Sequence, residues 1–119
     1  SSRVVLKLHP RLAPVQCAVL PLLKNKPELV EKAQRIFDDL RLAFHCPFDD
    51  KDAIGRRYRR QDAIGTPYCI TIDFDTLAAG TATIRDRDSL EQVRIPEQGL
   101  CRWIEDKISW KPLLEKADA

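Results

Sequence analysis

Four arginines and a tyrosine stand together near the middle of the chain, where residues 56–60 read Arg-Arg-Tyr-Arg-Arg. The guanidinium fork of arginine pairs with phosphate oxygens, and a tyrosine ring can stack on an unpaired nucleic-acid base. Arg56 and Arg60 are four residues apart, so on a helix they share a face and repel each other by about 0.2–0.5 kcal/mol. A bound phosphate backbone would offset this repulsion, so the segment indicates contact with nucleic acid.

A structural interpretation of the same segment stays open. Acidic residues at positions 49, 50 and 52 precede the arginines, and acids before a helix with bases further along it partly complement the helix dipole. Tyr58 lies four residues after Ile54, which places both on one helix face and favours a core position for the tyrosine. The spacing alone does not choose between phosphate contact and ion pairing.

A second polar group follows two predicted strands. The first strand carries Thr71, Asp73 and Asp75 on one face. The second carries Arg85 and Arg87, which would lie beside them in a hairpin. A carboxylate can accept from the exocyclic amine of cytosine, and arginine can donate to the ring acceptors. The alternative, which the spacing alone favours, is cross-strand ion pairing on a solvated face, which contributes little to stability.

The residue inventory argues against catalysis within this chain. General acid–base chemistry most often uses histidine, and the chain has only His9 and His45, each beside an apolar segment. No phosphate-binding G-x-x-x-x-G-K-[ST] loop and no G-x-G-x-x-G sequence is present. The four cysteines form no C-x-x-C pair, so we expect reduced, buried thiols, no metal site and no cofactor.

Composition places the chain among globular domains. The hydrophobic fraction is 44% and the charged fraction 32% in 119 residues, which suits a single domain with one core. The net charge is only +2, so any nucleic-acid function must be local. No apolar run approaches the about 20 residues that span a bilayer, and the first residues do not resemble a signal peptide, so we expect a cytosolic, cytoplasmic protein without membrane contact.

Hydrophobic periodicity predicts a fold of class α/β, with a mixed sheet packed by helices. We expect a linker at 1–15 and a C-terminal tail at 109–119. Asp52 is the predicted N-cap of the second helix, Gly65 its end, and Gly80 part of a short hairpin turn. Five strands are predicted at 16–20, 43–48, 68–75, 81–87 and 91–95, and three helices at 27–40, 53–64 and from Pro96 to 108.

Three segments resemble glycyl-tRNA synthetases. Residues 54–65, I-G-R-R-Y-R-R-Q-D-A-I-G, are similar to the family motif I-G-[RK]-R-Y-x-R-x-D-x-I-G. Residues 70–76, I-T-I-D-F-D-T, resemble the family strand [IV]-T-[IV]-D-F-D-T, and residues 81–89 follow at the family distance. Upstream, residues 12–14 and 19–22 also resemble the family, so the similarity covers most of the chain.

The resemblance implies the anticodon-binding domain of class II synthetases, a mixed five-stranded sheet surrounded by three helices, over residues 1–119. It implies binding to the anticodon region of tRNA for glycine, as the C-terminal domain of a glycine–tRNA ligase. In that family an upstream catalytic domain attaches glycine to tRNA with ATP and magnesium, usually within a homodimer. For this part alone we expect a monomer without ATP, cofactor or ligase activity.

The resemblance also implies roles for single residues, because glycine anticodons carry two cytosines. It points to Asp73 and Asp75 for the cytosine amines, or to Asp73 as a residue that holds Arg85. Thr71 belongs to the same RNA-binding set. The remaining RNA contacts are Arg85 and Arg87 for bases or phosphates, and Arg56, Arg57 and Arg60 for phosphates.

Two departures from the family pattern concern the same region. Residues 51–53 read Lys-Asp-Ala where the family has a small pair, so the loop that approaches RNA is expected to differ in shape. Arg59 stands at a position that varies in the family, and we leave it outside the site.

Two other hypotheses remain. The first is a stand-alone paralogue that serves as a nucleic-acid- or protein-binding accessory subunit. The second is an interaction module without RNA, which predicts that the arginine helix packs against acids.

Overall fold

The computed structural model of the chain describes residues 15–108. Apart from Val15, the expected linker 1–15 lies outside the described residues, as does the expected tail 109–119. The elements in chain order are β1 (Cys17–Pro21), α1 (Pro27–Leu40), α2 (Ile54–Ile64), β2 (Tyr68–Ile72), α3 (Phe74–Ala79), β3 (Thr81–Asp86), β4 (Gln92–Pro96), the 3-10 turn η2 (Glu97–Gly99) and α4 (Leu100–Ile108).

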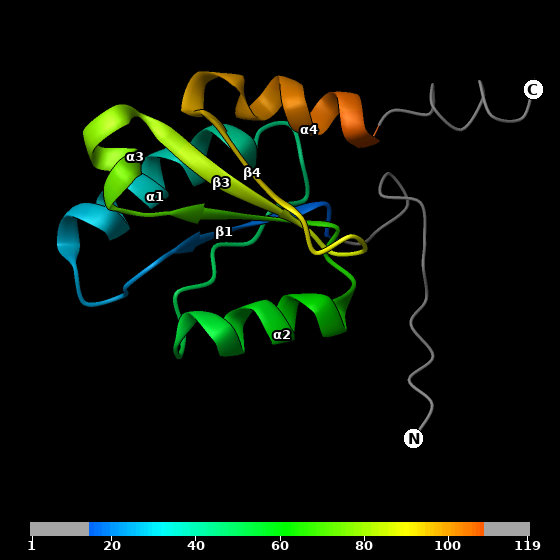
Figure 1. The fold of residues 1–119 in the computed structure, drawn as a ribbon, viewed down its shortest axis with the longest axis horizontal. Helices are drawn as coiled ribbons and strands as arrows, with labels where there is room; N and C mark the ends of the chain where they lie inside the picture. Colours follow the sequence, from blue (N-terminus) through cyan, green and yellow to red (C-terminus); the bar gives the residue numbers. More distant parts are fainter. Residues whose placement is uncertain (1–14, 109–119) are drawn as a thin grey trace, which may run out of the picture.

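The four strands form one mixed sheet in the order β1-β2-β3-β4. β1 pairs with β2 in parallel, whereas β2 with β3 and β3 with β4 pair antiparallel. Figure 1 shows α1 and α4 on one face of the sheet and α2 on the opposite face. The predicted class, α/β with a mixed sheet, is therefore confirmed.

The predicted count of five strands and three helices is wrong. The described residues form four strands and four α-helices. The segment predicted as a strand at 43–48 makes a single parallel bridge, between Val19 and Phe48. Its neighbour Pro47 accepts a hydrogen bond from the Val19 N–H but has no N–H to donate, which prevents a regular ladder.

The strand predicted at 68–75 ends at Ile72, because Asp73 begins a helix. Its Oδ1 accepts from the Thr76 N–H at 3.1 Å, and the Thr76 hydroxyl accepts from the Asp73 N–H at 3.0 Å. This reciprocal cap starts α3, and Gly80, with a φ of 69°, ends it. β2 and β3 pair antiparallel as predicted, but a helix connects them instead of a short turn.

Both faces of β2 are covered, so its alternation does not mark one solvated side. Tyr68, Ile70 and Ile72 face a core built with α1 and α4, while Cys69 packs with Ile54 of α2 on the other side. All five residues of the strand are buried. The prediction of a half-buried strand was wrong because a second helix layer lies over it (Figure 1).

The apolar stripes of the first and last helices are confirmed. α1 starts at Pro27. Proline has no N–H, and it suits the first helical turn because the N–H groups of that turn have no acceptor within the helix. Pro96, predicted to open the last helix, ends β4 instead, and the turn η2 separates it from α4. The stripes bury Leu29, Ala33, Ile36 and Leu40 of α1, and Leu100, Ile104 and Ile108 of α4.

α2 matches the predicted helix at 53–64 within one residue. Gly65 ends it in the left-handed conformation, with a φ of 90°, as expected of a glycine at that position. The predicted N-cap is wrong, because Ala53 occupies the cap position. Asp52 has a φ of 65° and directs its carboxylate to Arg60, at 3.1 Å.

The cysteines differ in exposure. Cys17 and Cys69 are buried as expected, whereas Cys46 is partly exposed and Cys101 is exposed. Burial raises the pKa of Cys69 to about 12, so this thiol stays protonated and unreactive at neutral pH.

Candidate nucleic-acid interface

One half of the sheet is left uncovered by α2. Residues paired directly across antiparallel strands lie on the same face, and Cys69, which packs under α2, pairs with Arg85, which in turn pairs with Gln92. Thr83 pairs with Arg94 in the same register. We call this row of five residues on the α2 side of β3 and β4 the open strip: Thr81, Thr83, Arg85, Gln92 and Arg94.

Arg85 is the centre of the open strip and is held on two sides. Its Nη1 and Nη2 donate to the two carboxylate oxygens of Asp62 at 3.0 and 3.1 Å. Its guanidinium carbon lies 4.9 Å from the centre of the Tyr58 ring, within range of a cation–π contact. The hydrogen bond with Asp62 raises the pKa of Arg85, so the residue is a fixed cation.

Tyr58 contacts the Arg85 guanidinium, and Thr71 in turn holds the Tyr58 hydroxyl. Their hydroxyl groups are hydrogen-bonded to each other, and Thr71 is only 5% exposed. Tyr58 packs against the core residues of β1 and β2, as its spacing from Ile54 predicted. Burial raises the pKa of the Tyr58 hydroxyl. The predicted contact of Thr71 with RNA therefore lacks an accessible hydroxyl in this conformation.

Asp73 and Asp75 lie at the far end of the open strip, beside Arg94. Arg94 donates to both carboxylate oxygens of Asp73 and to the Thr81 hydroxyl, the latter at 3.0 Å. Asp75 Oδ2 lies 3.8 Å from Arg94 Nη2. The predicted pairing of these acids with Arg85 and Arg87 is wrong.

Sequence reasoning missed Arg94, the partner of Asp73, and Asp62 of α2, the partner of Arg85. Arg94 could have been found by alternation, because it lies on the same side of the fifth predicted strand as Gln92 and opposite the apolar Val93 and Ile95. Asp62 gave no comparable signal, since its neighbour in space comes from a strand 23 residues later in the chain.

Arg57, a predicted phosphate contact, is buried and 1% exposed. Its Nη1 donates to the carbonyl oxygens of Pro21 and Asp49, and its Nη2 donates to that of Leu22 at 3.1 Å. Burial lowers the pKa of Arg57. The signal for burial was present in the sequence, because Arg57 follows Ile54 by three residues and so shares its inward face.

Acids accompany the outer arginines of α2. Arg60 donates to Asp49 at 2.8 and 3.0 Å and to Asp52 at 3.1 Å. Arg56 is 3.9 Å from Asp52, but its side chain is 70% exposed. The repulsion expected between Arg56 and Arg60 is thus relieved by protein carboxylates. Arg59, left outside the predicted site, is exposed.

Arg87 joins the end of β3 to the end of α2. Its side chain is 5% exposed, its Nη1 donates to the Gly65 carbonyl at 2.6 Å, and its Nε pairs with Asp88 at 3.0 Å. The guanidinium therefore fixes the strand to the helix terminus in this conformation, and little of it is available to RNA.

Asp49 links α2 to the loop before it through hydrogen bonds with Arg60 and Gln61. Its pKa predicts how the stability of the chain depends on acid. Burial raises the pKa of Asp49, but hydrogen bonds from Arg60 and Gln61 lower it by more than burial raises it. The pKa therefore lies below the usual value. The unfolded carboxyl titrates near about 3.9. Its contribution to stability is therefore complete above that pH and is lost as the pH falls through the folded pKa.

We expect Asp49→Asn to be less stable than the parent chain at pH 7, with a difference that shrinks toward pH 3. Urea unfolding at both pH values measures this, with Asp75→Asn, whose side chain is 75% exposed, as the matched control. A stability difference that stays constant between pH 7 and pH 3 would contradict the assigned role of the Asp49 carboxylate.

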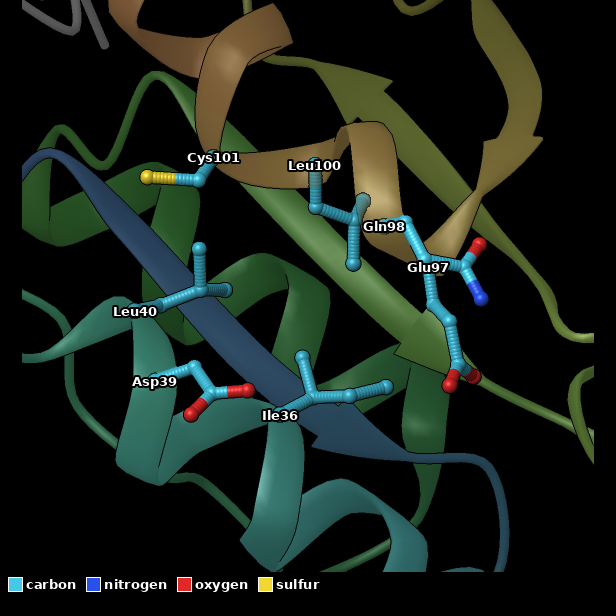
Figure 2. A pocket seen from close by; sticks show the side chains of 7 residues that line it. All are labelled: Ile36, Asp39, Leu40, Glu97, Gln98, Leu100 and Cys101. Carbon is cyan, nitrogen blue, oxygen red and sulfur yellow. The ribbon is translucent and has the colours of Figure 1, made fainter.

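A cavity of about 190 Å³ lies between α1 and α4, away from the arginine helix. It is lined by Ile36, Asp39, Leu40, Glu97, Gln98, Leu100 and Cys101 (Figure 2). Figure 2 shows the carboxylates of Asp39 and Glu97 on its two sides, and Lys32 pairs with Glu97 at 2.7 Å. Two carboxylates repel phosphate, so this cavity does not suit nucleic acid.

No group of three or more metal-ligating side chains gathers within residues 15–108. No helix in the same part of the chain is long and apolar enough to cross a membrane.

Comparison with known proteins gives the family of the chain. Residues 16–107 match the family model described as an anticodon binding domain. The chain is 51% identical over 106 residues to a glycine–tRNA ligase of Clostridium acetobutylicum, covering 89% of this chain and 22% of that protein. It is 61% identical over 95 residues to the enzyme of the same name from Malacoplasma penetrans, covering 80% of this chain and 20% of that protein.

A solved structure agrees with the fold. The RNA binding domain of threonyl-tRNA synthetase from Cryptosporidium parvum superimposes with a TM-score of 0.75 at 23% identity, over 85% of this chain and 25% of that chain. At that identity the likeness shows the fold alone. The chain spans about a fifth of the length of the curated relatives it matches. The chain therefore belongs to the anticodon binding domain family, in a form similar to part of the glycine–tRNA ligases.

Proposed function

We propose that this domain binds the anticodon loop of tRNA for glycine through the open strip and the exposed side of α2. The observation that carries the proposal is the half of the sheet that no helix within residues 15–108 covers on the α2 side, where Arg85 and Arg94 are each fixed by a carboxylate. An arginine paired with a carboxylate offers hydrogen-bond donors and acceptors side by side. The edge of an unpaired base carries both kinds of group and can bind to such a pair. The similarity to glycine–tRNA ligases supports the choice of tRNA.

The geometry redistributes the roles among the proposed contact residues. Arg56 and Arg59 are exposed on α2 and serve as phosphate contacts, and Arg60 adds a partly exposed cation. Arg85 and Arg94 face the bases. Three residues proposed from the sequence instead hold the interface in shape through partly buried hydrogen bonds: Arg57, Thr71 and Arg87.

The parent protein is proposed to be a cytoplasmic, homodimeric glycine–tRNA ligase. Its catalytic domain would bind ATP, magnesium and glycine and would hold the acceptor end of the tRNA. For the present part of the chain we expect a monomer in sedimentation and no aminoacylation of tRNA. Two linked contacts in the parent would raise the effective concentration of each site for the other.

A titration across a salt series tests the proposal. The RNAs are an anticodon stem-loop with both cytosines and a variant in which uracils replace them. We expect tighter binding of the cytosine RNA, and an affinity that falls with salt at a slope of about −0.7 for each phosphate contact on a single strand. Salt-dependent binding without base preference would limit the function to phosphate contact.

An RNA-independent interaction module is the second candidate, because Arg60 does pack against Asp49 and Asp52, as that hypothesis predicted. It requires that neither RNA binds at low salt. The same outcome would also favour an accessory paralogue, which a search of the parent gene for an upstream synthetase domain would separate.

A further inference from the structure

Asp62 of α2 and Arg85 of β3 are hydrogen-bonded to each other and form one polar edge beside the open strip. Their two hydrogen bonds, at 3.0 and 3.1 Å, use the terminal fork of the guanidinium. The side chains are 29% and 15% exposed, respectively, so a ligand can reach only an edge of the pair. The hydrogen-bonding groups on the exposed edge of the pair therefore determine which ligand can bind there.

The guanidinium keeps further donors for a ligand. Arginine has five N–H groups, and two of them are directed to Asp62. The neighbouring side of the group carries the Nε–H and the second Nη2–H, for which residues 15–108 provide no hydrogen-bonding acceptor. Nε is also absent from the buried atoms that lack a partner, so the Nε atom is in contact with solvent.

The order of groups along this edge is acceptor, donor, donor. Asp62 Oδ2 comes first, because it accepts from Nη2 at 3.1 Å, and the outer Nη2–H and the Nε–H follow. The Watson–Crick edge of cytosine has the complementary order, with the N4 amine as donor and N3 and O2 as acceptors. The two arrays match in number, sign and sequence.

We propose that Asp62 and Arg85 together recognise one cytosine of the bound RNA, with Asp62 as a specificity-determining residue. Arg85 donates to N3 and O2, and Asp62 accepts from the N4 amine. This inference rests on the proposed function, because it needs an unpaired anticodon base at the open strip. It assigns the amine contact to a residue of α2 and not to Asp73 or Asp75.

The pair is fixed before the base arrives. The Tyr58 ring lies 4.9 Å from the guanidinium carbon of Arg85 on one side, and the Tyr58 hydroxyl is itself bonded to Thr71. Side chains already ordered lose little freedom on binding. A fixed array also rejects wrong bases, since uracil presents O4 to the Asp62 carboxylate and its N3–H to an Arg85 donor.

Asp73 is a weaker candidate because its oxygens are already in use. Its Oδ1 accepts from the Thr76 N–H at 3.1 Å and from Arg94 at 3.3 Å, and its Oδ2 accepts from the other terminal nitrogen of Arg94. It caps α3 and holds Arg94. The two carboxylates thus differ in role, although each binds an arginine of the open strip.

The test compares Asp62→Asn with Asp38→Asn as the matched control, because Asp38 also pairs with an arginine, Arg41 at 3.6 Å, but lies on α1 outside the open strip. Each variant is titrated with the stem-loop that has both cytosines and with two RNAs in which one cytosine is replaced by uracil. We expect the parent chain to prefer cytosine at one position by about tenfold. Asp62→Asn should lose most of this preference and keep salt-dependent binding, and Asp38→Asn should keep the preference.

An unchanged preference in Asp62→Asn, or an equal loss in Asp38→Asn, overturns the inference while the proposed function stands. Failure of the parent chain to bind either RNA overturns the proposed function itself. If Asp62→Asn does not unfold cooperatively, Arg85→Lys replaces it, because lysine keeps the charge but lacks the fork. Retention of the cytosine preference in a folded Arg85→Lys chain also overturns the inference.

Discussion

Replacing Arg57 with alanine is expected to lower the free energy of unfolding by at least about 3 kcal/mol. The guanidinium donates to carbonyl oxygens of Pro21 and Leu22 at the end of β1 and of Asp49 before α2. These acceptors belong to two segments of the chain, which this side chain joins in addition to the backbone bridge between Val19 and Phe48. Alanine would leave them buried without a donor and would leave a cavity where the arginine stem packs.

Urea unfolding of the variant and the parent chain measures the effect. Arg56→Ala is the matched control, because the same residue type one position earlier has a side chain that is 70% exposed, and its loss should change stability by no more than about 0.5 kcal/mol. A decrease below about 1 kcal/mol for Arg57→Ala would show that the buried hydrogen bonds do not hold the two segments together.

Replacing Arg85 with alanine is expected to weaken binding of the cytosine stem-loop by about 1–3 kcal/mol. The substitution removes both donors proposed to contact the base, and it frees Asp62, whose unpaired carboxylate would then repel RNA phosphates. Stability should change less than binding, because the Asp62 side chain is 29% exposed and can be solvated.

Fluorescence anisotropy with labelled RNA gives the affinity change, and Arg41→Ala is the control. Arg41 carries the same charge at the end of α1, its side chain is 57% exposed, and it lies outside the open strip. Equal losses in the two variants would mean that RNA responds to net charge. An unchanged affinity for Arg85→Ala would remove this residue from the interface.

Local sequence signals predicted most elements of the fold correctly. The helix of α2 with its terminal Gly65, the pairing of β2 with β3, and the stripes of α1 and α4 are all present. The errors have local chemical causes. Pro47 interrupts a ladder because it lacks an N–H, and Asp73 ends a strand because it caps a helix with Thr76.

The candidate site was predicted less completely than the fold. The open strip contains Arg85 as expected, but its partner is Asp62, and the partner of Asp73 is Arg94. Residue types identified the chemistry of recognition, since acids and arginines were expected side by side. The identity of each pair depends on strand register and helix placement, which residue spacing within one element does not contain.

By itself the sequence determined the class of the fold, the helix that carries the arginines and the resemblance to glycyl-tRNA synthetases, because periodicity and motifs are properties of neighbouring residues. Only the tertiary structure decided which arginines face outward and which acids hold them. Arg57 and Arg56 have the same side chain one position apart, yet one is buried and the other exposed. The difference arises because a helix turns about 100° per residue, and the carbonyl groups that accept from Arg57 lie on one side of α2 only.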